Sequence, residues 1–173
     1  MQTLTADVVV LGPASAGMAA AADAHSADVI AVEAMEHIGG NAVWSTGYLA
    51  FVGSDMQRQQ DNADDEEVFL GDARAMVEQA REQFGVEWDE DLVRLFARES
   101  AETYRVLIER GVRFSCFIPR PKQHSVDRMA AVEDSWMLSR AFEHDFARPN
   151  VTTLYGAEQV QDPHVARPDE AHT

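Results

Sequence analysis

The stretch from Asp7 to Gly17 constrains the fold of this chain more than any other part of it. An apolar run, Val8–Leu11, is followed by the turn Gly12–Gly17 and then by an alanine-rich segment. This order predicts a strand over residues 5–11, a tight turn, and a helix from Ser15 to about His25. The first N–H groups of a helix have no partner within it, and they suit a diphosphate placed just beyond the strand end.

The turn matches most of the dinucleotide-binding fingerprint G-x-G-x-x-G. Gly12 and Gly17 hold the outer two glycine positions, whereas the middle position is Ala14. We expect the methyl group of Ala14 to push against the diphosphate or to force the turn outward. The candidate cofactor-binding residues of the turn are Gly12, Ala14, Ser15, Ala16 and Gly17.

A second apolar run, 28–33, predicts a parallel strand that ends in Glu33. In dinucleotide-binding folds an acid about 20 residues beyond the turn accepts hydrogen bonds from ribose hydroxyls, and Glu33 has this position and type. The alternative is an ordinary βαβ unit, in which the glycines serve only turn geometry and helix packing and Glu33 is a solvated charge. We favour nucleotide binding because strand, turn, helix, strand and acid occur in the required order.

The segment from Ile38 to Tyr48 is rich in glycine and in small hydroxyl side chains, and it has neither helical nor strand periodicity. Such a loop can press backbone N–H groups against a ligand, or it can be no more than a long turn. The residue types of this segment do not distinguish a ligand-binding loop from a long turn.

Taken together, the turn Gly12–Gly17, the acid Glu33, and the segment Ile38–Ala42 followed by Ser45–Gly47 resemble the N-terminal part of the fumarate reductase and succinate dehydrogenase flavoproteins. The resemblance extends from about residue 5 to about residue 155. It implies FAD as the cofactor, with a Gly-Gly-Asn loop that wraps the pyrophosphate and the flavin side. The loop residues that take this role are Gly39, Gly40, Asn41, Ala42, Ser45 and Gly47.

The resemblance also implies an α/β fold, in which a Rossmann-like FAD-binding βαβ unit is followed by the beginning of an inserted, mainly helical capping domain. We expect the FAD-binding portion over 1–53, the helical cap-like segment over 54–148 and a returning strand within 149–160. The segment 161–173 has two prolines and few apolar residues, so we expect a disordered tail there.

Residue patterns within the cap-like segment support this division. The acidic stretch 54–67 is typical of a linker that leads into a capped helix. Two buried amphipathic helices are expected next, one ending at Gly85 and one running from about Asp89 to Gly111. The further expected elements are a strand at 112–117, an irregular loop up to Arg128, a helix at 134–146 and a strand at 151–155.

Charge and residue types exclude several functions. The chain has 14 basic and 30 acidic residues and a formal net charge of −16, so it lacks the basic stripe that nucleic acid binding needs. Cys116 is the single cysteine, and the histidines show no metal-ligand spacing. No apolar stretch approaches the ~20 residues of a membrane helix, and no signal pattern precedes the first strand. We therefore expect a cytoplasmic protein that binds no nucleic acid, metal or membrane.

The resemblance implies a flavin-dependent oxidoreductase that transfers hydride at a C–C bond next to an electron-withdrawing group, on a small-molecule substrate such as a carboxylate or an enone. The family's substrate-binding histidines and arginines lie beyond the length of this chain, so the catalytic residues are unknown. A loop with His124, Arg120 and Arg128 could hold a carboxylate substrate, although scattered surface side chains are the commoner case.

Two other functions remain open. The chain could be a truncated or split, non-catalytic FAD-domain remnant or subunit. An incomplete sheet would then expose an edge and an apolar face, which favours self-association or a complementing chain. The chain could also be a regulatory module that binds only ADP or NAD, which would leave the Gly-Gly-Asn loop unexplained.

Overall fold

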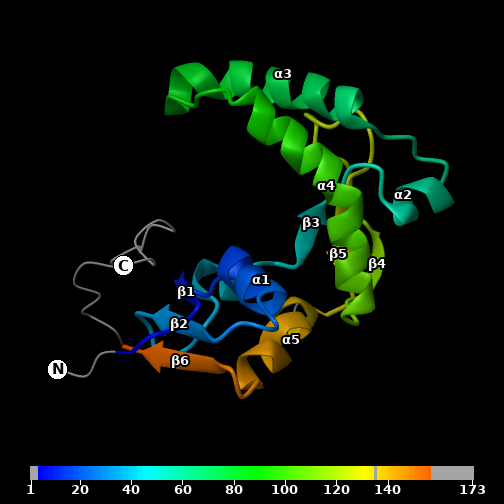
Figure 1. Cartoon of the computed structure of the whole chain (residues 1–173). Helices are drawn as coiled ribbons and strands as arrows, with labels where there is room; N and C mark the ends of the chain where they lie inside the picture. Colours follow the sequence, from blue (N-terminus) through cyan, green and yellow to red (C-terminus); the bar gives the residue numbers. More distant parts are fainter. Residues whose placement is uncertain (1–3, 135, 157–173) are drawn as a thin grey trace. The chain divides into compact units, whose positions relative to one another are not determined.

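The computed structural model describes residues 4–134 and 136–156, which form two compact units (Figure 1). The first unit combines the chain up to Val43 with the chain from His144 onward, and the second unit runs from Trp44 to Glu143. The predicted domain bounds at residues 53, 148 and 160 stay a prediction. The predicted tail, 161–173, lies outside the described residues.

The first unit is built on a three-stranded parallel sheet. Its strands are β1 (Val8–Leu11), β2 (Val29–Glu33) and β6 (Val151–Tyr155), and β2 is the central one. The helix α1 (Ser15–Asp23) connects β1 to β2, and the short 3-10 helix η2 (His144–Ala147) precedes β6. The predicted strand, turn, helix and strand are therefore confirmed, with β1 three residues shorter at its start.

Side chains alternate between the two faces of this sheet, because successive residues of a strand point in opposite directions. One face carries Val10 and Ala31, which pack with Ala21 of α1 in a small core. The opposite face carries Val9 and Leu11, which are 55% and 53% exposed. Parallel sheets usually have both faces covered, so this apolar face is a candidate surface for contact with further protein.

The described residues of the second unit contain a three-stranded antiparallel sheet and four α-helices. The strands are β3 (Tyr48–Ala50), β5 (Met129–Val132) and β4 (Phe114–Phe117), with β5 in the centre. The helices are α2 (Asp55–Gln59), α3 (Glu66–Phe84), α4 (Glu90–Glu109) and α5 (Trp136–Glu143). The sequence predicted β4 but not β3, β5 or α2, so the largely helical segment also contains an unpredicted sheet.

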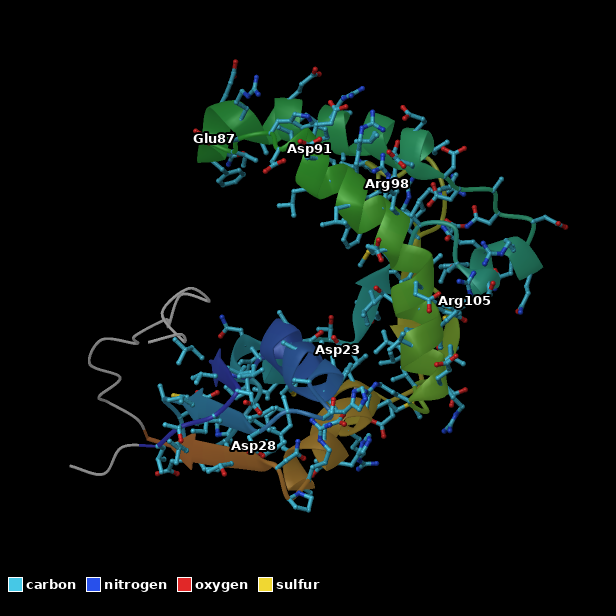
Figure 2. The ribbon with its side chains drawn as sticks, in the orientation of Figure 1. Asp23, Asp28, Glu87, Asp91, Arg98 and Arg105 are labelled. Carbon is cyan, nitrogen blue, oxygen red and sulfur yellow. The ribbon has the colours of Figure 1, made fainter. Side chains whose placement is uncertain are left out.

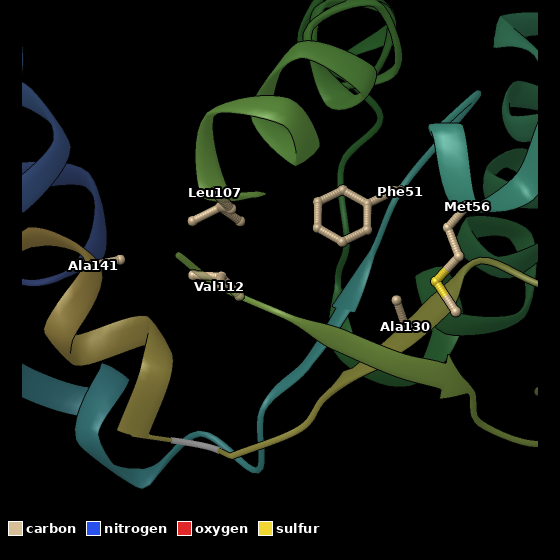
Figure 3. Close-up of a cluster of buried hydrophobic side chains, with 6 residues drawn as sticks. All are labelled: Phe51, Met56, Leu107, Val112, Ala130 and Ala141. Carbon is tan, nitrogen blue, oxygen red and sulfur yellow. The ribbon is translucent and has the colours of Figure 1, made fainter. Parts of the chain in front are cut away.

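A cluster of buried apolar side chains forms the core of the second unit (Figure 3). The ring of Phe51 meets the rings of Tyr104 and Phe114 edge-on, with centroids 5.2 and 5.3 Å apart. Removal of this apolar surface from water is the main term that stabilises the unit. The buried members of the cluster are Phe51, Met56, Leu107, Val112, Ala130 and Ala141.

Side-chain caps set the starts of α2, α3 and α4. Ser54 accepts the N–H of Gln57, whose side chain accepts the N–H of Ser54, and this pair is a capping box. Asp65 and Asp89 cap α3 and α4, and α3 ends at Gly85 with φ +63°. The acidic stretch predicted as a linker contains α2, because the capping box stabilises a helix start there.

The prediction of two buried amphipathic helices is confirmed for part of α4 and wrong for much of α3. On the predicted face of α4, Ala97, Ser100 and Leu107 are buried. On the predicted face of α3, by contrast, Met76 and Phe84 are 42% and 70% exposed. Their apolar periodicity is present in the sequence. Periodicity shows which face of a helix is apolar, and it does not show whether another element covers that face.

Charged side chains join α3 to α4. Arg94 donates hydrogen bonds to Glu66 at 2.6 Å and to Glu90 at 2.9 Å. Hydrogen bonds from Arg74 and Arg94 lower the pKa of Glu90 to about 2. Arg98, on the neighbouring turn of α4, also binds Glu66, and its side chain is 62% exposed (Figure 2). Because these side chains range from about a quarter to more than half exposed, solvent screens the pairs and we expect each one to contribute little to stability.

Candidate cofactor site

The first turn of the site follows directly from β1. The N–H of Gly12 donates to the carbonyl oxygen of Val32 at 2.9 Å, which places the turn at the carboxyl ends of β1 and β2. The helix α1 then begins at Ser15, with Ala14 as its N-cap residue. Among the described residues no side chain caps α1. Its first N–H groups, at the positive end of the helix dipole, are therefore available to an anion.

Gly17 brings α1 close to β1. A Cβ atom at this position would lie 2.6 Å from the carbonyl oxygen of Gly12 and 3.0 Å from Cγ1 of Val10. Both distances are too short for a methyl group, so only glycine fits this contact. The predicted tight packing at Gly17 is confirmed, and it holds the start of the helix beside the strand end.

Glu33 ends β2 beside the first turn. The parallel register pairs Leu11 with Val32, so Glu33 follows on β2 where Gly12 follows on β1. The Glu33 side chain is 5% exposed, and one carboxylate oxygen accepts the N–H of Met35 at 2.9 Å. The alternative in which Glu33 is a solvated strand-end charge is therefore wrong, because the structure holds this carboxylate in a buried position.

The second glycine-containing segment packs against the first turn. The N–H of Gly39 donates to the carbonyl oxygen of Pro13 at 3.0 Å, and the 3-10 helix η1 (Gly40–Trp44) follows. A Cβ atom on Gly40 would lie 3.3 Å from Cβ of Ala14. The two turns therefore lie side by side in the first unit, although β2 separates them in the sequence.

The structure thus brings together most of the residues predicted to bind the cofactor, and their contact with it stays a prediction. Ser45 and Gly47 belong to the second unit, where the N–H of Gly47 donates to Oγ of Ser45 at 3.2 Å. Sequence reasoning missed Pro13 and Met35, because they act through backbone groups that leave no signal in residue type. The predicted residues within the first unit are Gly12, Ala14, Ser15, Ala16, Gly17, Glu33, Gly39, Gly40, Asn41 and Ala42.

The loop that could hold a carboxylate substrate has both of its arginines paired with aspartates, as the commoner alternative expects. The guanidinium of Arg128 is fully buried and donates two hydrogen bonds to Asp64, at 2.7 and 2.8 Å. Arg120 is likewise paired with an aspartate, at 2.8 Å. Burial and the nearby Arg128 cation lower the pKa of His124, so this side chain is mainly neutral at pH 7. Neither arginine is free to hold a substrate carboxylate.

Two other kinds of site are absent from the described ranges, 4–134 and 136–156. No group of three or more His, Cys, Asp or Glu side chains there could hold a metal ion. No helix there combines the length and the apolar character that crossing a bilayer needs. The predicted cytoplasmic location stays a prediction.

The two turns and Glu33 fit the dinucleotide part of a flavin cofactor. The free N–H groups of α1 are donors for a diphosphate, and the carboxylate of Glu33 is an acceptor for ribose hydroxyls. The family model described as an FAD binding domain matches residues 7–160. The chain belongs to the FAD binding domain family. The cofactor of this FAD binding domain is FAD, as the sequence predicted.

Solved structures resemble this FAD binding domain over most of its length. The open conformation of a flavocytochrome c3 fumarate reductase has a TM-score of 0.73 at 25% identity, over 89% of this chain and 27% of that one. The 3-ketosteroid-Δ4-(5α)-dehydrogenase from Rhodococcus jostii RHA1 has a TM-score of 0.70 at 21% identity, over 87% and 38%. A quinol-fumarate reductase has a TM-score of 0.60 at 19% identity, over 90% and 27%.

These comparisons confirm the predicted resemblance to fumarate reductase flavoproteins and the α/β fold of the FAD binding domain. No curated protein sequence matches the domain. The domain spans 27% to 38% of the length of the three solved chains. What those longer proteins do beyond binding the cofactor can therefore only be proposed for this chain.

Proposed function

We propose that this FAD binding domain is the cofactor-binding module of a flavin-dependent oxidoreductase of the fumarate reductase type. The reaction is hydride transfer at a C–C bond next to an electron-withdrawing group, on a small carboxylate or enone. The observation that supports it best is the TM-score of 0.73 at 25% identity to a fumarate reductase. Bound FAD supplies the hydride chemistry of such an enzyme, and the protein binds and orients it.

Three groups of residues divide the binding work in this proposal. The N–H groups at the start of α1, from Ser15 to Gly17, donate hydrogen bonds to the diphosphate. The carboxylate of Glu33 accepts hydrogen bonds from the ribose hydroxyls. The second turn, Gly39–Ala42, offers further N–H groups to the pyrophosphate and the flavin side, with Ser45 and Gly47 as further candidates. The first two groups lie at the carboxyl edge of the parallel sheet, where cofactors of open α/β folds bind.

We assign no catalytic residue to this chain. A substrate carboxylate needs free cations, and hydride transfer to a C–C double bond needs a proton donor beside the substrate. The two arginines that the sequence singled out, Arg120 and Arg128, are paired with aspartates of the same unit. We infer that the substrate-binding groups belong to a part of the enzyme outside the segment that matches 27% of the fumarate reductase.

An absorbance spectrum of the purified chain, before and after addition of FAD, is the first test. Bound flavin has bands near ~370 and ~450 nm, and we expect them to stay with the protein through gel filtration. The loaded protein is then mixed with a reduced dye as electron donor and with fumarate or an enone steroid as acceptor. Dye oxidation that depends on one acceptor supports the proposed reaction. A chain that does not retain FAD contradicts the proposed cofactor-binding module.

A second candidate function rests on the open face of the first unit. Val9 and Leu11 leave an apolar surface on a parallel sheet, a kind of sheet that usually has both faces covered. This surface favours a non-catalytic subunit whose open sheet face is covered by another protein chain. A complementing chain, or self-association, would then complete the site. Light scattering over a range of concentrations tests this: a strict monomer that turns over substrate alone would contradict it.

A further inference from the structure

Ala14 stands where the dinucleotide-binding fingerprint has its middle glycine. Glycine is needed at such a position either for a positive φ angle or for the close approach of a ligand. The backbone of Ala14 has φ −83° and ψ −162°, an extended conformation that any L-residue adopts without strain. The backbone conformation therefore gives no reason for glycine, and the direction of the methyl group decides whether alanine is tolerated.

The methyl group of Ala14 lies beside Gly40. A Cβ atom built on Gly40 would be 3.3 Å from Cβ of Ala14, which is closer than two carbon atoms prefer, about 3.5–4.0 Å. The neighbouring residues hold this contact in place, because the N–H of Gly39 donates to the carbonyl oxygen of Pro13 at 3.0 Å. The space between the two turns thus has room for one methyl group, and Ala14 supplies it.

We propose that Ala14 and Gly40 are an interlocked pair, in which the methyl group of Ala14 is a spacer between the two turns. The spacer sets the separation between the N–H groups of the α1 start and those of the second turn. Ala14 is then a positioning residue for the FAD diphosphate, and Gly40 lacks a side chain in order to admit it. The inference rests on the proposed cofactor-binding role of both turns.

The substitution Ala14→Gly distinguishes the spacer from the alternative in which the methyl group obstructs the diphosphate, because the two predict opposite changes in FAD affinity. If the methyl group pushes against the diphosphate, its removal tightens FAD binding. If the methyl group is a spacer, its removal frees the backbone and loosens the contact between the turns. We then expect the dissociation constant for FAD to rise about threefold or more. Titration of the apoprotein with FAD, followed by flavin fluorescence, measures the change.

A double-mutant cycle with Gly40→Ala tests the contact itself. The single substitution Gly40→Ala weakens FAD binding for two reasons, the contact with the Ala14 methyl group and the strain at φ +50°. In the Ala14→Gly background only the strain remains. We therefore expect the effect of Gly40→Ala to be at least about threefold smaller in that background. Such rescue would not follow from a general loss of structure.

The thermal unfolding midpoints of the apoproteins in the same cycle measure the contact in the absence of FAD. Gly71→Ala in α3 is the matched control, because no atom lies within 4 Å of a Cβ there, and its effect should be the same in both backgrounds. Tighter FAD binding by Ala14→Gly, or additive effects at 14 and 40, overturns the proposal. If the wild-type chain does not bind FAD, the proposed function fails. Coupling between the two substitutions in the unfolding midpoints would still support the contact between Ala14 and Gly40, and additivity would still contradict it. If Gly40→Ala does not fold in either background, the direction in which Ala14→Gly changes FAD affinity tests the proposal.

Discussion

The side chains of Arg128 and Asp64 are both fully buried and are joined by two hydrogen bonds, of 2.7 and 2.8 Å. Asp72 accepts a further hydrogen bond from Arg128, and Gln57 donates to Asp64 at 3.0 Å. The ring of Phe69 lies 5.3 Å from the guanidinium carbon. A buried charge is tolerated only when it is paired and hydrogen-bonded, and this one joins the start of α3 to the residue that precedes β5.

We expect Arg128→Met to destabilise the second unit by about 3–5 kcal/mol, because it leaves two carboxylates in a buried site without their cation. Urea unfolding followed by circular dichroism measures the loss. Arg120→Met is the matched control, since its ion pair with Asp127 is partly exposed and we expect a cost below about 1 kcal/mol. An equal loss in the free energy of unfolding for the two substitutions would show that the buried ion pair is no more important for stability than the exposed one.

The stability of the second unit should depend on pH through Asp72. Burial raises the pKa of Asp72, but hydrogen bonds from the N–H and hydroxyl of Ser125 and from Arg128 outweigh burial, so this pKa lies below its usual value of 3.8. A carboxyl group with a lowered pKa in the folded state stabilises the fold when ionised. That stabilisation is present above about pH 4 and is lost as the pH falls through the lower folded value.

We therefore expect the free energy of unfolding of the wild type to exceed that of Asp72→Asn at pH 7, and the difference to shrink between about pH 5 and pH 2. Denaturant titrations at several pH values give both curves. Ser125→Ala should lie between them, because it removes the hydroxyl donor and keeps the N–H donor. A difference that stays constant over this range would argue against the lowered pKa.

Glu33 is the single side chain on which we expect FAD affinity to depend most. Glu33→Ala removes the buried acceptor at the end of β2. Because a lost hydrogen bond to a charged group costs more than one between neutral groups, we expect the dissociation constant for FAD to rise about 10- to 100-fold. Equilibrium titration with FAD measures it. Glu36→Ala, at an exposed position three residues on, is the control. Unchanged affinity in the Glu33 variant would remove this residue from the site.

Two helical glycines should respond to alanine in opposite directions. At Gly17 of α1 the new Cβ would lie 2.6 Å from the carbonyl oxygen of Gly12, so we expect a loss of about 1–3 kcal/mol from overpacking, together with weaker FAD binding. At Gly71 of α3 the Cβ meets nothing within 4 Å, so we expect a gain of up to about 1 kcal/mol from helix propensity. Thermal unfolding of both variants checks the contrast, and a stabilised Gly17→Ala would refute the close contact.

The open face of the parallel sheet should control association. We expect Val9→Thr combined with Leu11→Thr to lower the average mass seen by light scattering at high concentration, because polar side chains reduce the apolar surface while threonine keeps a strand-compatible shape. Leu92→Thr, at an exposed site on α4 in the other unit, is the comparison. An equal effect of Leu92→Thr would move the associating surface to the helices, and no effect of any variant would rule out both surfaces.

The local elements of the fold follow from residue type and spacing. Short runs of apolar and β-branched residues predict β1, β2 and β6, the turn Gly12–Gly17 predicts the start of α1, and the Asp89 and Gly85 caps predict helix ends. Each of these features depends on residues within a few positions of one another, so residue type and spacing are sufficient. The family resemblance extended this to FAD, because the motif residues also occur in a fixed order.

Tertiary structure alone decided the contacts between distant segments. The pairing of β3 with β5, the burial of Arg128 between Asp64 and Asp72, and the contact of Ala14 with Gly40 each join parts of the chain that no periodicity relates. The same sequence pattern also left open whether the apolar faces of α3 and α4 were covered. A residue's type sets what it can contact, but its partner depends on which segments the folded backbone brings within a few ångströms.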